Sequence, residues 1–403
     1  MIRSRSVVAL LASQAISGLG SQLTFVALPW FVLVTSGSPS RMALVFAVEV
    51  LPVAVLGIPS GGVVQRYGAR TTMVVCDLVS APLIALIPLL HALDALSFPL
   101  LLVIVFATGV FLTPYFSASR LLVPELFGED DRAVAQGNSV LEGTTQLMGL
   151  VGPAVAGVLI AWLGAANVLW LDAASFLVSF ALLATLVPRG TLVAPEEHER
   201  GILAGVRYIA RDRLLRLVTV VSLLVGIVIP FLFAALPVLA YRRFDGRAEV
   251  AGWMFAAWGG GSVAGSVFAY RAVTRFAPLP LARAAFVACA LPLWALLFHL
   301  PIAGVMAAIF ACAFFVPSLN APILGLFSLR SPPALRGKTM TALVTANSLA
   351  RPLSFAVAGP LLVHAGLGVT FAVVAVGLTV AAAVFVVGTL DAPESAVEEA
   401  APT

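Results

Sequence analysis

The stretch Gly61–Arg70, GGVVQRYGAR, decides the fold of this chain because it separates two long apolar segments. Its Tyr67-Gly68 pair predicts a helix break, and Arg66 and Arg70 lie on either side of that break. Basic residues between two apolar segments are typical of a short loop at a membrane surface, where the chain turns back. The stretch therefore predicts a turn between two membrane helices.

The composition extends this prediction to the whole chain. Of its 403 residues, 61% are hydrophobic and only 10% are charged, which excludes a soluble domain of this length. Apolar runs of about 18 residues or more predict membrane-spanning helices. We expect an all-α membrane protein with twelve spans, at 7–34, 42–65, 71–91, 97–119, 136–163, 167–188, 214–240, 248–270, 279–299, 301–327, 339–364 and 367–390. The first run is too long for a signal peptide, so we expect it to be retained as a helix.

The basic residues predict the orientation. With both termini in the cytoplasm, eighteen of the 23 Lys and Arg residues lie on the inner side, which agrees with the positive-inside rule. Four lie outside, namely Arg41, Arg242, Arg243 and Arg247. The net charge of +4 is thus a signal of topology, and it does not indicate nucleic-acid binding.

Internal repeats predict two pseudo-symmetric six-helix bundles. The pair Arg66 and Arg70 recurs 205 residues later as Arg271 and Arg275. Two dipeptides recur at similar offsets: Asn138-Ser139 as Asn347-Ser348, and Gly152-Pro153 as Gly359-Pro360. We expect bundles at 1–188 and 214–390, a cytoplasmic linker at 189–213 and an acidic cytoplasmic tail at 391–403. Within the linker, residues 201–213 have apolar residues at helical spacing, which indicates an amphipathic helix on the inner membrane surface or a solvated connection.

The chain resembles the drug-exporter branch of the major facilitator superfamily, which includes macrolide-efflux and enterobactin-exporter proteins. Residues 61–70 are similar to its loop motif Gly-x-x-x-Asp-Arg-x-Gly-x-Arg, with Gln65 in place of the aspartate. The stretches LGSQLTFVALP, EVLPVAVLGIPSGGVVQRYGAR, GPAVAGVLIAWLGAANVLWLDAASF and PPALRGKT extend the resemblance along the chain. It implies alternating access between the two bundles, with the substrate bound between them.

The resemblance also implies sites. It assigns gate-loop roles to Gly61, Arg66, Gly68, Arg70, Arg271 and Arg275, an antiporter motif to Gly152, Pro153 and Gly157, and pocket positions to Gln14, Thr24, Thr113, Tyr115, Ser222, Phe231, Phe315 and Asn320. Each set has a plainer interpretation that stays open. The arginines can anchor the loop at lipid phosphates, the proline can only kink its helix, and the pocket residues can only pack.

Charges inside the predicted spans are functional candidates, because a charge in hydrocarbon is costly. They are Glu49, Asp77, Glu142, Asp172 and Arg351. We expect Glu49 to pair with Arg351, Glu142 and secondarily Glu49 to carry a coupling proton, Asp77 to orient the gate arginines, and Asp172 to be structural or interfacial. A satisfied structural pair is the alternative for each acid. Two carboxylates that the branch often has are absent, at Ser21 and Gln65.

Other functions find little support in the residues. The GKT at 337–339 lacks the first glycine of a phosphate loop, the three cysteines indicate packing, and the His, Cys and Asp residues form no pattern suited to a metal or a nucleophile. We therefore expect a monomeric transporter of the inner plasma membrane, without cofactor, that exports a small hydrophobic or amphipathic molecule in exchange for protons. A siderophore or metabolite exporter and an uncoupled facilitator are the alternatives within transport. An intramembrane enzyme and a membrane sensor are the alternatives outside it.

Overall fold

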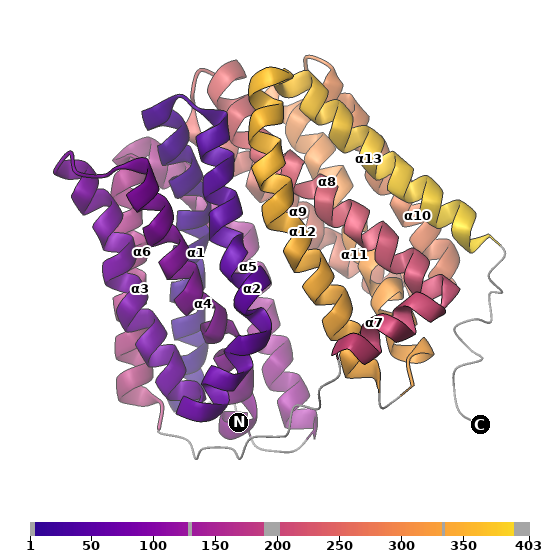
Figure 1. Ribbon diagram of the computed structural model, residues 1–403, viewed down its shortest axis with the longest axis horizontal. Helices are drawn as coiled ribbons and strands as arrows, with labels where there is room; N and C mark the ends of the chain where they lie inside the picture. The colour runs from indigo at the N-terminus through magenta and orange to yellow at the C-terminus, as the bar shows by residue number, and fades with distance from the viewer. Residues whose placement is uncertain (1–4, 128–130, 189–201, 333–334, 391–403) are drawn as a thin grey trace. The chain divides into compact units, whose positions relative to one another are not determined.

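The computed structural model describes residues 5–127, 131–188, 202–332 and 335–390, and all the regular elements in these ranges are helices (Figure 1). They are α1 Arg5–Ser36, α2 Pro39–Tyr67, α3 Ala69–Ala92, α4 Phe98–Phe127, α5 Asp131–Leu163, α6 Ala165–Leu186, α7 Ile202–Arg211, α8 Arg213–Arg243, α9 Ala248–Ala272, α10 Pro278–Ala290, the 3-10 helix η1 Leu291–Leu297, α11 Ile302–Arg330, α12 Arg336–His364 and α13 Gly366–Thr389. The expected all-α class is confirmed. The linker residues 189–201 and the acidic tail 391–403 lie outside the described ranges.

Ten helical segments in the described residues are long and apolar enough to cross a membrane. They correspond to ten of the twelve predicted spans, with α10 and η1 together forming one of them. The predicted spans at 248–270 and 339–364 coincide with α9 and α12, which are long helices of lower hydropathy. The reason is composition, because α9 is rich in glycine and α12 carries threonine, asparagine and arginine.

Glycines with positive φ angles make the sharp turns between successive helices. Gly68 has φ +81°, and it separates α2 from α3 as a single residue. Its N–H donates to the carbonyl oxygen of Val64 at 2.8 Å, which satisfies one of the free carbonyls at the end of α2. Gly164, with φ +83°, separates α5 from α6 in the same way, and Gly366, with φ +80°, is the first residue of α13, directly after Ala365, which separates α12 from α13. Other residues rarely adopt this conformation, so the predicted break at Tyr67-Gly68 is confirmed and has a local cause.

The chain divides into two compact units. Unit 1 contains residues 1–197 and 240–256, and unit 2 contains residues 198–239 and 257–403. The main division lies near the predicted linker. The segment 240–256, which joins α8 to α9, groups with the first unit although it lies in the second half of the sequence.

Unit 1 is built around α1, which packs against α5 and α6, while α4 packs against α2 and α3. Two glycines allow the close approaches. A Cβ atom on Gly20 would overlap the side chains of Ser175 and Asp172 on α6. A Cβ atom on Gly109 of α4 would lie 2.6 Å from Cγ of Pro52 on α2. These approaches bring polar side chains of α2 and α6 into the interior of the unit.

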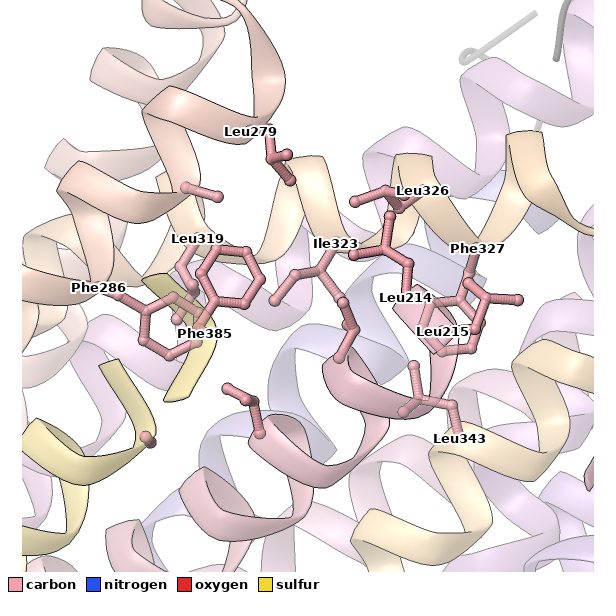
Figure 2. Packing of buried hydrophobic residues seen from close by; sticks show 14 of the residues in the cluster. Leu214, Leu215, Leu279, Phe286, Leu319, Ile323, Leu326, Phe327, Leu343 and Phe385 are labelled. Carbon is pink, nitrogen blue, oxygen red and sulfur yellow. The ribbon is translucent and has the colours of Figure 1, made fainter. Parts of the chain in front are cut away.

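Unit 2 has an apolar core formed by α8, α10, α11, α12 and α13. Figure 2 shows Leu215, Phe286, Phe327 and Phe385 in this core, and the rings of Phe286 and Phe385 lie 4.7 Å apart. The short helix α7 lies against α12 and contributes Ile209 to the same core. This helix occupies the stretch in which an amphipathic helix is expected, and part of its apolar face is covered by protein.

Candidate functional site

A cavity of about 260 Å³ lies inside unit 1. It is lined by residues of α1 to α6, which are Gln14, Ser17, Gly18, Ser21, Gln22, Thr24, Phe25, Leu28, Glu49, Val50, Val53, Ile84, Val105, Thr108, Gly109, Leu112, Tyr115, Phe116, Thr145, Met148, Asp172 and Phe176. Thirteen of these 22 residues are apolar, aromatic or glycine, and the other nine have polar side chains. This composition is typical of sites that bind small organic molecules.

Among the described residues, two carboxyl groups line this cavity and no lysine, arginine or histidine does. Asp172 of α6 is buried, and its oxygens accept hydrogen bonds from the hydroxyls of Thr24 and Ser175. Oε2 of Glu49 on α2 is buried and has no hydrogen-bond partner among the described residues. A buried carboxylate without a cation is costly, so the cavity favours a ligand that brings positive charge or hydrogen-bond donors.

A third carboxyl group, Asp77 of α3, is fully buried beside the cavity. Its Oδ2 accepts a hydrogen bond of 2.5 Å from the hydroxyl of Ser179 on α6. Its Oδ1 has no partner in the described part of the chain. Among the described residues, Asp77 and Arg70 form no ion pair. The expected role of Asp77 in orienting the gate arginines is therefore not supported by a direct contact and stays a prediction.

Arg70 instead caps the C-terminal end of α6. Its Nε and Nη2 donate to the carbonyl oxygens of Val187 and Ala184 at 2.7 and 2.6 Å. The last carbonyls of a helix have no partner within the helix, and a cation there also complements the helix dipole. Arg66 is exposed and lies over the ring of Tyr67, with 5.5 Å between Cζ and the ring centroid. The two arginines of the loop thus have different surroundings.

In the second half of the chain, a different arginine caps the end of a helix in the same manner. Arg283 of α10 donates to the hydroxyl of Thr389, at 2.9 Å, and to the carbonyl oxygen of the same residue at the end of α13. Arg271 and Arg275, which the sequence spacing pairs with Arg66 and Arg70, are exposed around the end of α9. The structural counterpart of Arg70 is therefore Arg283, because a longer connection at 273–277 replaces the single glycine found at Gly68.

Comparison with known proteins gives the family. A family model described as transmembrane secretion effector, within the major facilitator superfamily, matches residues 2–402. The chain belongs to this superfamily. It is a transporter-family protein with many membrane-spanning helices and not an enzyme.

Several relatives are named "Multidrug efflux pump Tap". The protein from Mycolicibacterium fortuitum is 30% identical over 371 residues, which cover 88% of each chain. The protein from Mycobacterium tuberculosis is 27% identical over 373 residues, which cover 87% of this chain and 86% of that one. An uncharacterized transporter of Bacillus subtilis, YfiS, is 26% identical over 92% of this chain and 89% of its own length.

Solved structures share the fold at low sequence identity. The nucleoside transporter NupG has a TM-score of 0.76 at 12% identity, and the alignment covers 95% of this chain and 98% of that one. A D-xylose–proton symporter has a TM-score of 0.70 at 18% identity, covering 94% and 96% of the two chains. These likenesses support the superfamily fold alone.

The segment that resembles the family's antiporter motif is a site of close helix packing. A Cβ atom on Gly157 would lie 2.8 Å from Cα of Gly252, and one on Gly152 would overlap the side chain of Gln22. Pro153 is buried in the same helix, and its carbonyl oxygen faces Gly252. These glycines let α5 approach both α1 and the part of α9 that belongs to unit 1. Gly61 of the gate loop has no such close neighbour.

The other charges of the predicted spans are less buried than expected. The side chain of Glu142 is 54% exposed, and its carboxylate lies 3.4 Å from Nη2 of Arg120. Arg351 lies at the surface of α12 in unit 2, whereas Glu49 belongs to unit 1. The pairing of Glu49 with Arg351 and the proton-carrying role of Glu142 stay predictions.

Three of the eight predicted pocket residues line the cavity, namely Gln14, Thr24 and Tyr115. Thr113 is buried and donates to the carbonyl oxygen of Gly109 in its own helix. The remaining four belong to unit 2, where Phe231 is buried, Ser222 and Phe315 are half-buried and Asn320 is exposed. Sequence reasoning missed Ser17, Gln22 and Phe176, and it assigned Asp172 a structural or interfacial role.

The thiols of unit 2 include one close pair that the sequence did not predict. Sγ of Cys289 on α10 lies 3.3 Å from Sγ of Cys312 on α11, and both cysteines are buried and free.

The described residues contain no group of three or more metal-binding side chains. The chemistry of the site is therefore that of carboxyl and hydroxyl groups in an apolar cavity.

Proposed function

We propose that this protein is a secondary active transporter that exports a small hydrophobic or amphipathic molecule by alternating access, in exchange for protons. The observation that carries the proposal is the cavity of unit 1, where Glu49 and Asp172 face an otherwise largely apolar wall. An apolar wall suits the body of such a molecule, and a buried carboxyl group can bind either a cationic group or a proton. The names of the relatives support export.

The proposal includes the architecture that the superfamily implies. We propose that α9 and α12 cross the membrane together with the ten candidate spans, as twelve helices in two six-helix bundles. We place the protein as a monomer in the inner plasma membrane with both termini in the cytoplasm. The excess of basic residues on the inner side supports this orientation.

Transport in everted membrane vesicles tests the proposal. Ethidium, an amphipathic fluorescent cation, is supplied outside vesicles that contain the protein, and its accumulation is followed with and without an imposed pH gradient. We expect accumulation that stops when the gradient is collapsed. Faster entry that is unaffected by the gradient and stops when the concentrations are equal indicates an uncoupled facilitator, and no entry above that of empty vesicles overturns the proposed function for this class of molecule.

Two substitutions connect transport to the cavity. Glu49→Gln and Asp172→Asn remove the charges of the cavity wall, and we expect each to raise the KM for ethidium by at least about tenfold. Thr108→Val is the matched control, because Thr108 also lines the cavity but its hydroxyl donates to the carbonyl oxygen of Ile104 in its own helix. Equal KM values for all three variants would show that ethidium binds elsewhere.

A further inference from the structure

A row of hydroxyl groups connects Asp77 with the cavity of unit 1. The hydroxyl of Ser179 on α6 donates to Oδ2 of Asp77 on α3 at 2.5 Å. The hydroxyl of Tyr115 on α4 lies 3.5 Å from the same serine oxygen. Three helices therefore contribute one group each to a continuous polar path through a region that is otherwise apolar.

The path reaches the cavity at Tyr115. This residue is part of the cavity wall. Ser17 lines the cavity as well. Because Tyr115, Ser179 and Asp77 are all buried, with side chains at most 3% exposed, bulk water does not reach the middle of the path from its sides.

Asp77 is surrounded by groups that cannot neutralise a negative charge. The titratable groups near it are Cys76 on its own helix, Tyr115 on α4 and Asp172 on α6. Arg70, at the start of α3, is bound to carbonyl oxygens of the α6 end. A carboxyl group in such surroundings is far less costly when it is protonated. Ser179 donates to Oδ2 while Asp77 is ionised; in the neutral acid the O–H on Oδ2 donates to Ser179 instead, the serine hydroxyl turns to Tyr115, and Oδ1 is the carbonyl oxygen.

We propose that Tyr115 and Ser179 pass a proton between the cavity and Asp77, so that Asp77 is the group that exchanges a proton during transport. This inference rests on the proposed function, because it specifies where the coupling proton binds. It assigns the role to a buried residue of α3 in place of Glu142, which forms an exposed pair with Arg120.

The transfer balances at every oxygen. On release, the carboxyl O–H of Asp77 gives its proton to Ser179, Ser179 gives its own to Tyr115, and Tyr115 gives its own to a water molecule in the cavity. Each hydroxyl loses one proton and gains one, Asp77 becomes a carboxylate, and the water molecule carries the positive charge. Uptake is the reverse. The 3.5 Å step between Tyr115 and Ser179 exceeds the usual O–H···O distance of about 2.8 Å, so it limits the rate until α4 and α6 approach each other.

Time-resolved infrared spectroscopy after a light-triggered pH jump tests the path without any substrate. The full-length protein in detergent is followed at the carbonyl stretch of protonated carboxyl groups, and the signal of Asp77 is the one that Asp77→Asn removes. We expect Tyr115→Phe and Ser179→Ala to keep the amplitude of this signal but to slow its change at least about tenfold, which corresponds to ~1.4 kcal/mol of added barrier.

Two further variants separate the path from general damage. Ser179→Thr keeps the hydroxyl and should restore the rate. Ser60→Ala removes a buried serine that pairs with Ser117 at 2.9 Å outside the path, and it should leave the rate unchanged. Equal rates in wild type, Tyr115→Phe and Ser179→Ala overturn the path, and so does the absence of any protonated Asp77 signal. Export that ignores the pH gradient in vesicles, with these infrared rates as expected, overturns the proposed coupling and leaves the path itself intact.

Discussion

Gly20 and Gly18 of α1 offer a sharp test of the packing that places Asp172 in the cavity. A Cβ atom on Gly20 would overlap the side chains of Asp172 and Ser175, and it would lie 2.9 Å from Cβ of Ser175. A Cβ atom on Gly18 would instead lie 3.5 Å from Cγ of Met148, which is an ordinary contact. The two glycines are two residues apart in one helix and thus form a matched pair.

The expected magnitudes follow from two opposing effects. Replacing a glycine by alanine inside a helix stabilises it by about 0.5–1 kcal/mol. Overpacking at a tight contact costs about 1–3 kcal/mol. We therefore expect Gly18→Ala to be neutral or stabilising by up to about 1 kcal/mol, and Gly20→Ala to be destabilising by about 1–2 kcal/mol.

Unfolding of the purified protein in detergent, followed by tryptophan fluorescence during titration with a denaturing detergent, measures both changes. Gly20→Ala should also raise the KM for ethidium, because the carboxyl group of Asp172 must move away from Thr24. If the two variants have the same free energy of unfolding, α1 and α6 do not approach each other at Gly20, and the position assigned to Asp172 in the cavity wall is wrong.

Two further predictions concern the ends of helices. Arg70→Ala should destabilise the protein by about 2–4 kcal/mol, because two hydrogen bonds from a charged group to the carbonyl oxygens of Ala184 and Val187 are lost. Arg66→Ala should change the stability by less than about 0.5 kcal/mol. Thermal unfolding compares the two variants, and equal losses of stability would contradict the capping role of Arg70. Asp212→Ala should cost about 1–2 kcal/mol, because Oδ1 accepts from the N–H groups of Leu214 and Leu215 at the start of α8 and Oδ2 pairs with Arg330. Asp212→Ser, which can still cap the helix, should recover most of this loss, and a serine variant as unstable as the alanine one would show that the cap contributes little.

The positions of the membrane helices were largely predictable from the sequence. Backbone groups inside a bilayer must be paired within their own segment, so a long apolar run is restricted to helix whatever its neighbours are. The turn at Gly68 was predictable for a similarly local reason, because Gly68 adopts a φ angle that other residues avoid. The lower hydropathy of α9 and α12 is also a local property of their composition.

Part of the cavity lining was also visible in the sequence, as a pattern along one helix. The lining residues of α1 lie at helical spacing along one face, as Gln14, Ser17, Gly18, Ser21, Gln22, Thr24, Phe25 and Leu28. A stripe of small and polar residues on an otherwise apolar helix indicates a face that meets something other than lipid. Ser17 and Gln22 belong to this stripe but carry no signal as single residues, so they were not predicted.

Only the tertiary structure decided which groups meet across helices. Asp77 and Ser179 are 102 positions apart, and Arg70 and Val187 are 117 positions apart, so no local pattern could relate them. The sequence spacing matched Arg70 with Arg275, but the packing of α10 on α13 gives the equivalent contacts to Arg283. Apolar periodicity determines where a membrane helix begins and ends, while the approach of one helix to another depends on glycines and polar groups at single positions, such as Gly20 beside Asp172. The helices of this protein were therefore readable from its sequence, and the carboxyl and hydroxyl groups that share its cavity were not.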